Sequence, residues 1–220
     1  DIFVFDAFGV SHREECTTVG VADHLDTVAG LNIKHEINTI KKLVESKSRP
    51  MTIIISGAKV STKIVLIKKL LEKCDNMILG GGILNTFLKA KGYEVGSSLL
   101  EENFIQEARE ILESDSTNKI LFPSDLSCQS KNGVANIDVS SISENDIIYD
   151  IGTRSIEKIK DIVKKSSSVF WNGPLGYIEK KPFNRGTEEL ANSIAEHNCF
   201  SIVGGGDTLP IIESLNLQDN

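Results

Sequence analysis

Short apolar segments alternate with amphipathic segments along most of the chain. Apolar runs typical of buried strands occupy residues 2–5, 51–55, 76–79, 119–122, 147–151, 168–171 and 200–203. Apolar residues at helical spacing predict helices over residues 34–46, 61–73, 83–91, 102–114, 155–165, 187–196 and 208–215. The polar stretch 124–146 indicates no clear element.

The last six predicted strands are rich in Ile and Val, and helices separate most of them. This alternation favours a parallel sheet with both faces covered. We therefore expect a Rossmann-like three-layer α/β/α sandwich around a mainly parallel six-stranded sheet, plus the tail of a second α/β domain. The expected boundaries are residues 1–33 for that tail, 34–48 for an interdomain helix and linker, and 49–220 for the sandwich.

Both ends of the chain interrupt this pattern. The sequence starts at Asp1 directly before a predicted strand, and it ends with NLQDN directly after a predicted helix. From these ends we expect a fragment of a longer protein.

Composition narrows the class of protein. The 220 residues are 40% hydrophobic and 25% charged, with a net charge of -7, so a broad basic surface for nucleic acid is not expected. No apolar run approaches the roughly 18 residues of a membrane span. The four scattered cysteines favour a reducing cytoplasmic location, and the four histidines lack the spacing of a zinc site.

Glycine follows five of the six predicted strands of the sandwich. The turns contain SGAKVSTK (56–63), GGG (80–82), Gly152, NGPLG (172–176) and GGGDT (204–208). The carboxyl ends of parallel strands share one edge of a sheet, where ligands bind. Each glycine alone fits a tight connection, but five together favour a phosphate- or nucleotide-binding rim of bare backbone N–H groups.

Charged residues at this rim support an anion site. With Ser61 as a helix N-cap, Lys63 falls in the first helical turn and Lys59 just before it, where cations are unfavourable unless an anion lies between them. The alternative is a pair of solvated surface lysines. Asp207 is either a plain N-cap or a Mg²⁺ ligand beside bound phosphates.

Two further polar residues have open alternatives. The Asn172 amide either donates to a phosphate or forms an Asx-turn, and Glu179 either accepts from ribose hydroxyls or is a solvated loop charge. The P-loop motif is absent. The dinucleotide motif G-x-G-x-x-G fails at Asn85 and again at Leu209, where its third glycine is required.

Seven segments together resemble phosphoglycerate kinase in order and spacing, and they cover nearly the whole chain. They are DAFGVSHR (6–13), SGAKVSTK (56–63), GGGILNTFLKAKG (80–92), DIG (150–152), WNGPLGYIE (171–179), FNRGT (183–187) and SIVGGGDT (201–208). Against the family pattern, Ser56 replaces a glycine, Tyr177 replaces a smaller apolar residue and Thr153 replaces a proline.

The resemblance implies a two-domain, hinge-bending kinase that transfers a phosphoryl group between 1,3-bisphosphoglycerate and ADP, giving 3-phosphoglycerate and ATP in glycolysis. Residues 1–33 would belong to the substrate-binding domain and residues 49–220 to the nucleotide-binding domain. The resemblance also implies Mg²⁺, a monomeric parent, and poor turnover by this piece alone. A dinucleotide-dependent oxidoreductase and a silent nucleotide-binding module are the alternatives.

The resemblance also assigns site residues by position. Arg13 corresponds to a phosphoglycerate ligand, Lys59 to the lysine that follows the transferred phosphoryl group, and Lys63 to a nucleotide-phosphate lysine. The residues implied for the nucleotide are Gly57, Ala58, Gly81, Gly82, Ile148 and Tyr149 around the adenine, Asn172 at the phosphates, Glu179 at the ribose, and Gly205, Gly206, Asp207 and Thr208 at the phosphate tail and metal.

Overall fold

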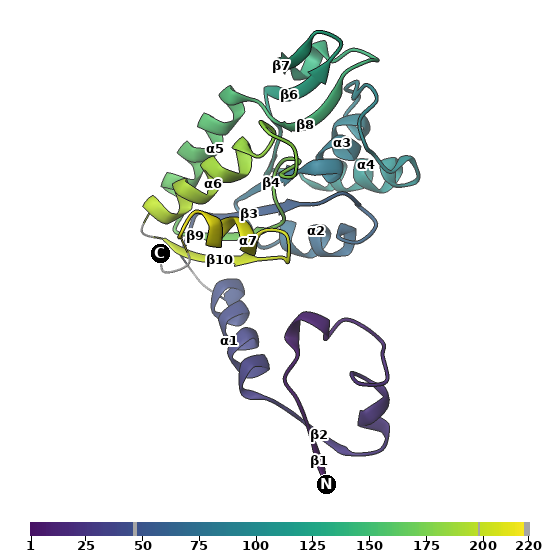
Figure 1. Ribbon diagram of the computed structural model, residues 1–220, viewed down its shortest axis with the longest axis vertical. Coiled ribbons are helices and arrows are strands. Elements are labelled where there is room, and N and C mark those ends of the chain that lie inside the picture. Colours follow the sequence, from purple (N-terminus) through teal and green to yellow (C-terminus); the bar gives the residue numbers. More distant parts are fainter. Residues whose placement is uncertain (46–47, 198, 218–220) are drawn as a thin grey trace. The chain divides into compact units, whose positions relative to one another are not determined.

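The computed structural model describes residues 1–45, 48–197 and 199–217 (Figure 1). The chain divides into two compact units, Asp1–Lys47 and Ser48–Asn220. Within the described ranges, no helix has both the length and the apolar character that crossing a membrane requires.

The smaller unit contains a parallel strand pair and one long helix. β1 (Ile2–Phe5) pairs with β2 (Asp26–Ala29), and two short 3-10 helices, η1 (Phe8–Val10) and η2 (Gly20–Asp23), lie between them in the sequence. α1 spans Leu31–Glu45. β2 was not predicted from the sequence, and residue 46, the last of the predicted helix, lies outside the described residues.

One carboxylate fixes the start of α1. Asp6, directly after β1, accepts hydrogen bonds from the backbone N–H of Ile33 at 2.9 Å and from the side-chain amide of Asn32 at 3.0 Å. It satisfies an N–H group that the first helical turn leaves unpaired. The helix therefore starts three residues before the predicted position.

The larger unit is built on five parallel strands in the order β10-β9-β3-β4-β5. Every residue of β3 is buried, so other elements cover both faces of the sheet. The predicted α/β sandwich with a mainly parallel sheet is confirmed. Its strands are β3 (Met51–Ser56), β4 (Asn76–Gly80), β5 (Ile120–Leu121), β9 (Ser168–Asn172) and β10 (Phe200–Gly204).

Helices lie between the strands of this sheet along the chain. α5 packs against α6, and α3 packs against α4 (Figure 1). In α5 the buried apolar residues Ile156, Ile159 and Val163 recur at helical spacing and form one face. The helices are α2 (Ile64–Leu71), α3 (Gly81–Ala90), η3 (Glu102–Phe104), α4 (Ile105–Ser114), α5 (Thr153–Lys165), α6 (Arg185–Glu196) and α7 (Leu209–Ser214).

The parallel sheet has five strands instead of the predicted six, because the predicted strand 147–151 belongs to a second, antiparallel sheet. β6 (Asp125–Ser130) and β7 (Gly133–Asp138) form a hairpin, followed by the 3-10 helix η4 (Val139–Ser141). β8 (Ile147–Ile151) pairs with β6 rather than with a parallel neighbour (Figure 1). The polar stretch 124–146, which indicated no element, supplies this partner.

Gly152, one of the five predicted rim glycines, therefore follows a strand of the second sheet. Its backbone N–H donates to the carbonyl oxygen of Asp125 at 2.9 Å. A Cβ atom at this position would lie 2.3 Å from Cγ of the Asp125 side chain. Close packing against Asp125 explains this glycine, and the prediction that it belongs to the rim of the parallel sheet is wrong.

The buried Asp125 carboxylate caps α5. It accepts the backbone N–H groups of Arg154 at 3.1 Å and Ser155 at 2.8 Å, together with the Ser155 hydroxyl at 2.6 Å. Burial opposes ionisation, but the Ser155 hydroxyl, these N–H groups and the Arg154 charge outweigh it and hold the pKa of Asp125 below its usual range.

Asp125→Ala should lower the unfolding free energy of the larger unit by about 1–3 kcal/mol at pH 7, because buried donors lose their acceptor. Since the folded pKa is depressed, the difference should persist above about pH 4 and shrink as the pH falls through the folded value. Urea denaturation followed by fluorescence of Trp171, the single tryptophan and fully buried, measures it.

Asp138→Ala is the matched control, because Asp138 pairs with the same Arg154 at the exposed surface. Exposed ion pairs contribute little, so this variant should unfold close to wild type. Equal losses in the two variants would contradict the capping role of Asp125.

Candidate functional site

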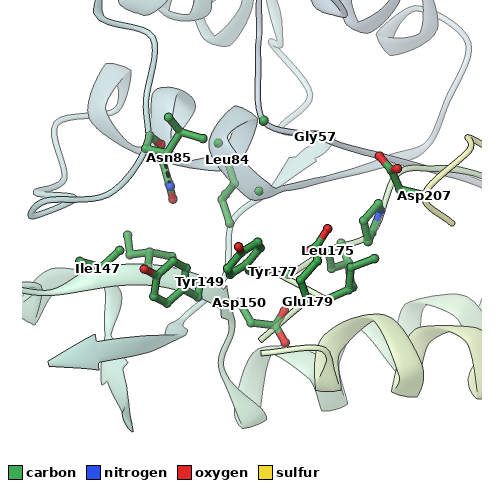
Figure 2. A pocket seen from close by; sticks show the side chains of 18 residues that line it. Gly57, Leu84, Asn85, Ile147, Tyr149, Asp150, Leu175, Tyr177, Glu179 and Asp207 are labelled. Carbon is green, nitrogen blue, oxygen red and sulfur yellow. Dashed lines mark hydrogen bonds between the residues drawn. The ribbon is translucent and has the colours of Figure 1, made fainter. Parts of the chain in front are cut away.

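A cavity of about 450 Å³ opens between the turns after β3 and β4 on one side and β8 with the loop after β9 on the other (Figure 2). Its lining residues come from segments far apart in the sequence. They are Gly57, Ala58, Gly81, Gly82, Leu84, Asn85, Leu99, Ile147, Ile148, Tyr149, Asp150, Pro174, Leu175, Gly176, Tyr177, Ile178, Glu179 and Asp207.

Two glycine-bearing turns in direct contact form one wall. A Cβ atom at Gly82 would lie 2.2 Å from the carbonyl oxygen of Ala58, and one at Gly81 would lie 2.7 Å from that of Gly57. Gly81 also has φ +60°, which favours glycine. The absence of side chains lets the turns after β3 and β4 touch, and it leaves flat bare backbone facing the cavity.

Aromatic residues form another part of the lining. The Tyr149 ring stacks on the Tyr177 ring with centroids 5.5 Å apart, and it packs against Phe183 at 4.8 Å. The Tyr177 N–H donates to the Tyr149 carbonyl at 2.8 Å, which joins the β9–α6 loop to β8. Lys180 Nζ lies 4.7 Å from the Tyr149 ring centroid. Tyr177, which replaces a smaller apolar residue of the family pattern, thus lines the cavity.

A half-buried lysine lies beside the cavity. Lys63 Nζ donates to the Ser56 carbonyl at 2.5 Å and to Asn172 Oδ1 at 2.6 Å. The Asx-turn alternative for Asn172 is wrong, because the residue two positions on is Pro174, which has no N–H to donate to the Asn172 oxygen. Burial lowers the pKa of Lys63, and the Asp207 carboxylate partly opposes that shift. The site combines a desolvated cation with a carboxylate on a separate turn.

The turn after β10 is tied to the turn after β9. Thr208, fully buried, accepts the backbone N–H of Gly173 at 3.1 Å and is the N-cap residue of α7. Asp207 precedes the cap and is exposed, so the alternative of Asp207 as a plain N-cap is wrong. Figure 2 shows Asp207 at one end of the cavity and Asn85 and Ile147 toward the other.

The sequence profile described as phosphoglycerate kinase matches residues 1–220. This chain belongs to the phosphoglycerate kinase family. It is 42% identical over 222 residues to a phosphoglycerate kinase of Baumannia cicadellinicola subsp. Homalodisca coagulata, and 42% identical over 226 residues to one of Dictyoglomus turgidum. Both matches cover 100% of this chain and 57% of the relative, so the chain spans little more than half of their length.

Solved phosphoglycerate kinase structures are similar to this fold. The structure from Coxiella burnetii has a TM-score of 0.88 and 35% identity, covering 100% of this chain and 58% of that one. The structure from Pyrococcus horikoshii OT3 has a TM-score of 0.83 and 29% identity, covering 97% of this chain and 56% of that one. The resemblance to phosphoglycerate kinase found in the sequence is confirmed.

The residues that the family pattern assigns to the nucleotide fall into two groups. One group lines the cavity and consists of Gly57, Ala58, Gly81, Gly82, Ile148, Tyr149, Glu179 and Asp207. The other group surrounds the Lys63 ammonium or the turn after β10 and consists of Asn172, Gly205, Gly206 and Thr208. The structure brings both groups together, and their roles stay predictions.

Two assigned residues are not among those that line the cavity. Lys59 is exposed and does not line the cavity, and Arg13 belongs to the smaller unit, where it forms an exposed ion pair with Glu15 at 3.6 Å. The predicted N-cap role of Ser61 is wrong, because α2 begins at Ile64. Instead the Ser61 N–H and hydroxyl each donate to the Glu101 carboxylate at 2.8 Å.

Asp150 is a buried carboxylate that sequence reasoning missed as a site residue. It lines the cavity and accepts the backbone N–H groups of Gly186 at 2.7 Å and Ile151 at 2.8 Å. Burial raises the pKa of Asp150 to about 7, although these N–H groups and the Arg185 charge favour ionisation. A charged residue inside the apolar run IIYDI was the available signal.

Asp150 should make the larger unit less stable as pH rises. Its folded pKa lies above the unfolded value of about 3.9, so the unfolding free energy should fall between about pH 4 and 7, by up to about 1.4 kcal/mol per unit. Asp150→Asn should remove this part of the pH dependence in urea denaturation at pH 4.5, 6 and 7.5. If the unfolding free energies of variant and wild type change with pH in parallel, the raised pKa of Asp150 is contradicted.

Proposed function

We propose that the cavity binds ADP or ATP with Mg²⁺, and that the protein to which this chain belongs transfers a phosphoryl group between 1,3-bisphosphoglycerate and ADP. The observation that carries the proposal is the cavity's uneven polarity. A half-buried ammonium, that of Lys63, and a carboxylate, that of Asp207, lie at one end, and an apolar slot lies at the other. An apolar base joined to charged phosphates has the same asymmetry.

The nucleoside fits the apolar part of the cavity. Bare backbone at Gly57–Ala58 and Gly81–Gly82 gives a flat face for a base, and the stacked ring of Tyr177 offers an apolar surface nearby. Glu179 is exposed at the lining, and we assign its carboxylate to the ribose hydroxyls as a hydrogen-bond acceptor. Aromatic and backbone surfaces of this kind are common in ligand pockets.

The phosphates fit the turns around Lys63. Its ammonium supplies positive charge, and Asn172, whose oxygen is held by Lys63, keeps its Nδ2 donor for a phosphate oxygen. A Cβ atom at Gly205 would lie 3.7 Å from that Nδ2, so the turn after β10 is adjacent and its N–H groups are within reach of the same phosphates.

Asp207 fits a Mg²⁺ ligand. It is exposed on the turn after β10, and its carboxylate accepts no hydrogen bond from a described residue. Among the described residues, no group of three or more His, Cys, Asp or Glu side chains forms a metal cage. Mg²⁺ typically combines one or two carboxylates with phosphate oxygens, so Asp207 would hold it together with the nucleotide. The metal would neutralise phosphate charge there.

Phosphoryl transfer by this family requires positioning and charge neutralisation rather than a covalent intermediate. We assign Lys59, exposed on the turn after β3, to the transferred phosphoryl group. Arg13 is assigned to the phosphoglycerate. The proposal also includes a glycolytic role in the cytoplasm as a monomer, supported by family membership and by four cysteines that are free thiols.

Titration calorimetry of the 220-residue chain with ADP and Mg²⁺ tests the nucleotide proposal. Lys63→Met keeps the apolar stem but removes the charge, so it should weaken ADP binding at least about tenfold, since hydrogen bonds to charged groups are strong. Lys68→Met, an exposed lysine on α2, is the control and should bind ADP as wild type does. The fluorescence of buried Trp171 verifies the fold of each variant.

NAD is titrated in parallel to test the alternative of a dinucleotide-dependent oxidoreductase, which family membership does not favour. Tight NAD binding without ADP binding would overturn the proposal. Unchanged ADP affinity in a folded Lys63→Met variant would show that the phosphates do not lie at this lysine.

A further inference from the structure

One buried hydrogen-bond acceptor in the cavity receives no hydrogen bond from the residues that the structure describes. Asn85 lies on α3, is only 2% exposed and lines the cavity. Its Nδ2 donates to the Leu99 carbonyl at 2.9 Å, whereas Oδ1 is buried and has no hydrogen-bond partner among the described residues. Buried polar atoms are nearly always paired, so this oxygen points to a donor that arrives with a ligand.

The orientation of this side chain is fixed by its partner. A backbone carbonyl only accepts hydrogen bonds, so the nitrogen of the Asn85 amide must face Leu99 and the oxygen must face away from it. Figure 2 shows the end of the Asn85 side chain pointing into the cavity. The cavity therefore presents a fixed acceptor and rejects groups that bring a second acceptor to the same point.

The position of Asn85 determines which part of a nucleotide it meets. It shares its end of the cavity with Leu99, whose carbonyl accepts its amide N–H. Ile147 lies toward the same end, whereas Asp207 lies toward the other end (Figure 2). With the phosphates beside Lys63 and the ribose between, the edge of the base farthest from the sugar reaches Asn85. In a purine nucleotide that edge carries the substituent on C6.

We infer that Asn85 is a specificity-determining residue whose Oδ1 accepts a hydrogen bond from the 6-amino group of a purine base. An amino group at C6 supplies the missing donor, whereas an oxo group places a second acceptor against Oδ1. The pocket therefore selects 6-aminopurine over 6-oxopurine nucleotides. This inference rests on the proposed nucleotide binding and adds the group that reads the base.

Titration calorimetry of the 220-residue chain with Mg²⁺ and three nucleotides tests the role of Asn85 in selecting the base. The ligands are ADP, inosine diphosphate with a 6-oxo group, and purine riboside diphosphate with hydrogen at C6. Wild type should bind ADP at least about tenfold more tightly than either analogue, because a buried acceptor left unpaired is unfavourable. Inosine diphosphate should bind most weakly.

Asn85→Leu replaces the amide with an apolar side chain of similar size. It should reduce ADP affinity to that of purine riboside diphosphate and leave the affinity for that analogue close to wild type. Leu99→Ala trims an exposed apolar side chain at the same end of the cavity but keeps the carbonyl that holds Asn85. Leu99→Ala should lower the affinity for each of the three nucleotides by the same factor.

If Asn85→Leu does not fold, the three nucleotide affinities of the wild type still test the inference. Equal affinity of the wild type for the three nucleotides would overturn the inference and leave the proposed function standing. An unchanged preference for ADP in a folded Asn85→Leu variant would also overturn the inference without affecting the proposed function. Failure of the wild type to bind any of the three would overturn the proposed function itself.

Discussion

The Lys63 ammonium connects the segments that make the site. It donates to the Ser56 carbonyl at the end of β3 and to Asn172 at the end of β9, while its own backbone precedes α2. A Cβ atom at Gly57 or Gly173 would lie 3.4 or 3.2 Å from Nζ. The glycines of these turns therefore make room for a half-buried cation as well as exposing backbone to a ligand.

This arrangement explains the uneven polarity of the cavity. The Thr208 hydroxyl holds the turn after β10 against the turn after β9, which keeps Asp207 near the ammonium without a direct bond between them. Away from this charged end, contact between the bare turns after β3 and β4 leaves a mainly apolar slot with the Asn85 amide at its far end. Charge and apolar surface are thereby separated along one cavity.

Sequence patterns predicted the parts of the fold that depend on local periodicity. The buried run 51–55 and its neighbours became parallel strands because uninterrupted apolar residues suit a sheet covered on both faces. The pairing of β8 was not predictable, since its partner β6 lies in a polar hairpin. Asn85 and Asp150 were missed because only tertiary packing shows that one oxygen lacks a donor and that a carboxylate is buried.

A crystal structure of the chain with ADP and Mg²⁺ tests this placement of the nucleotide, because it locates both the base and the phosphates in the cavity. We expect the phosphates within hydrogen-bonding distance of Lys63 Nζ and Asn172 Nδ2, and the 6-amino group beside Asn85 Oδ1. A nucleotide bound with its base at the Asp207 end, or bound outside this cavity, would contradict the account.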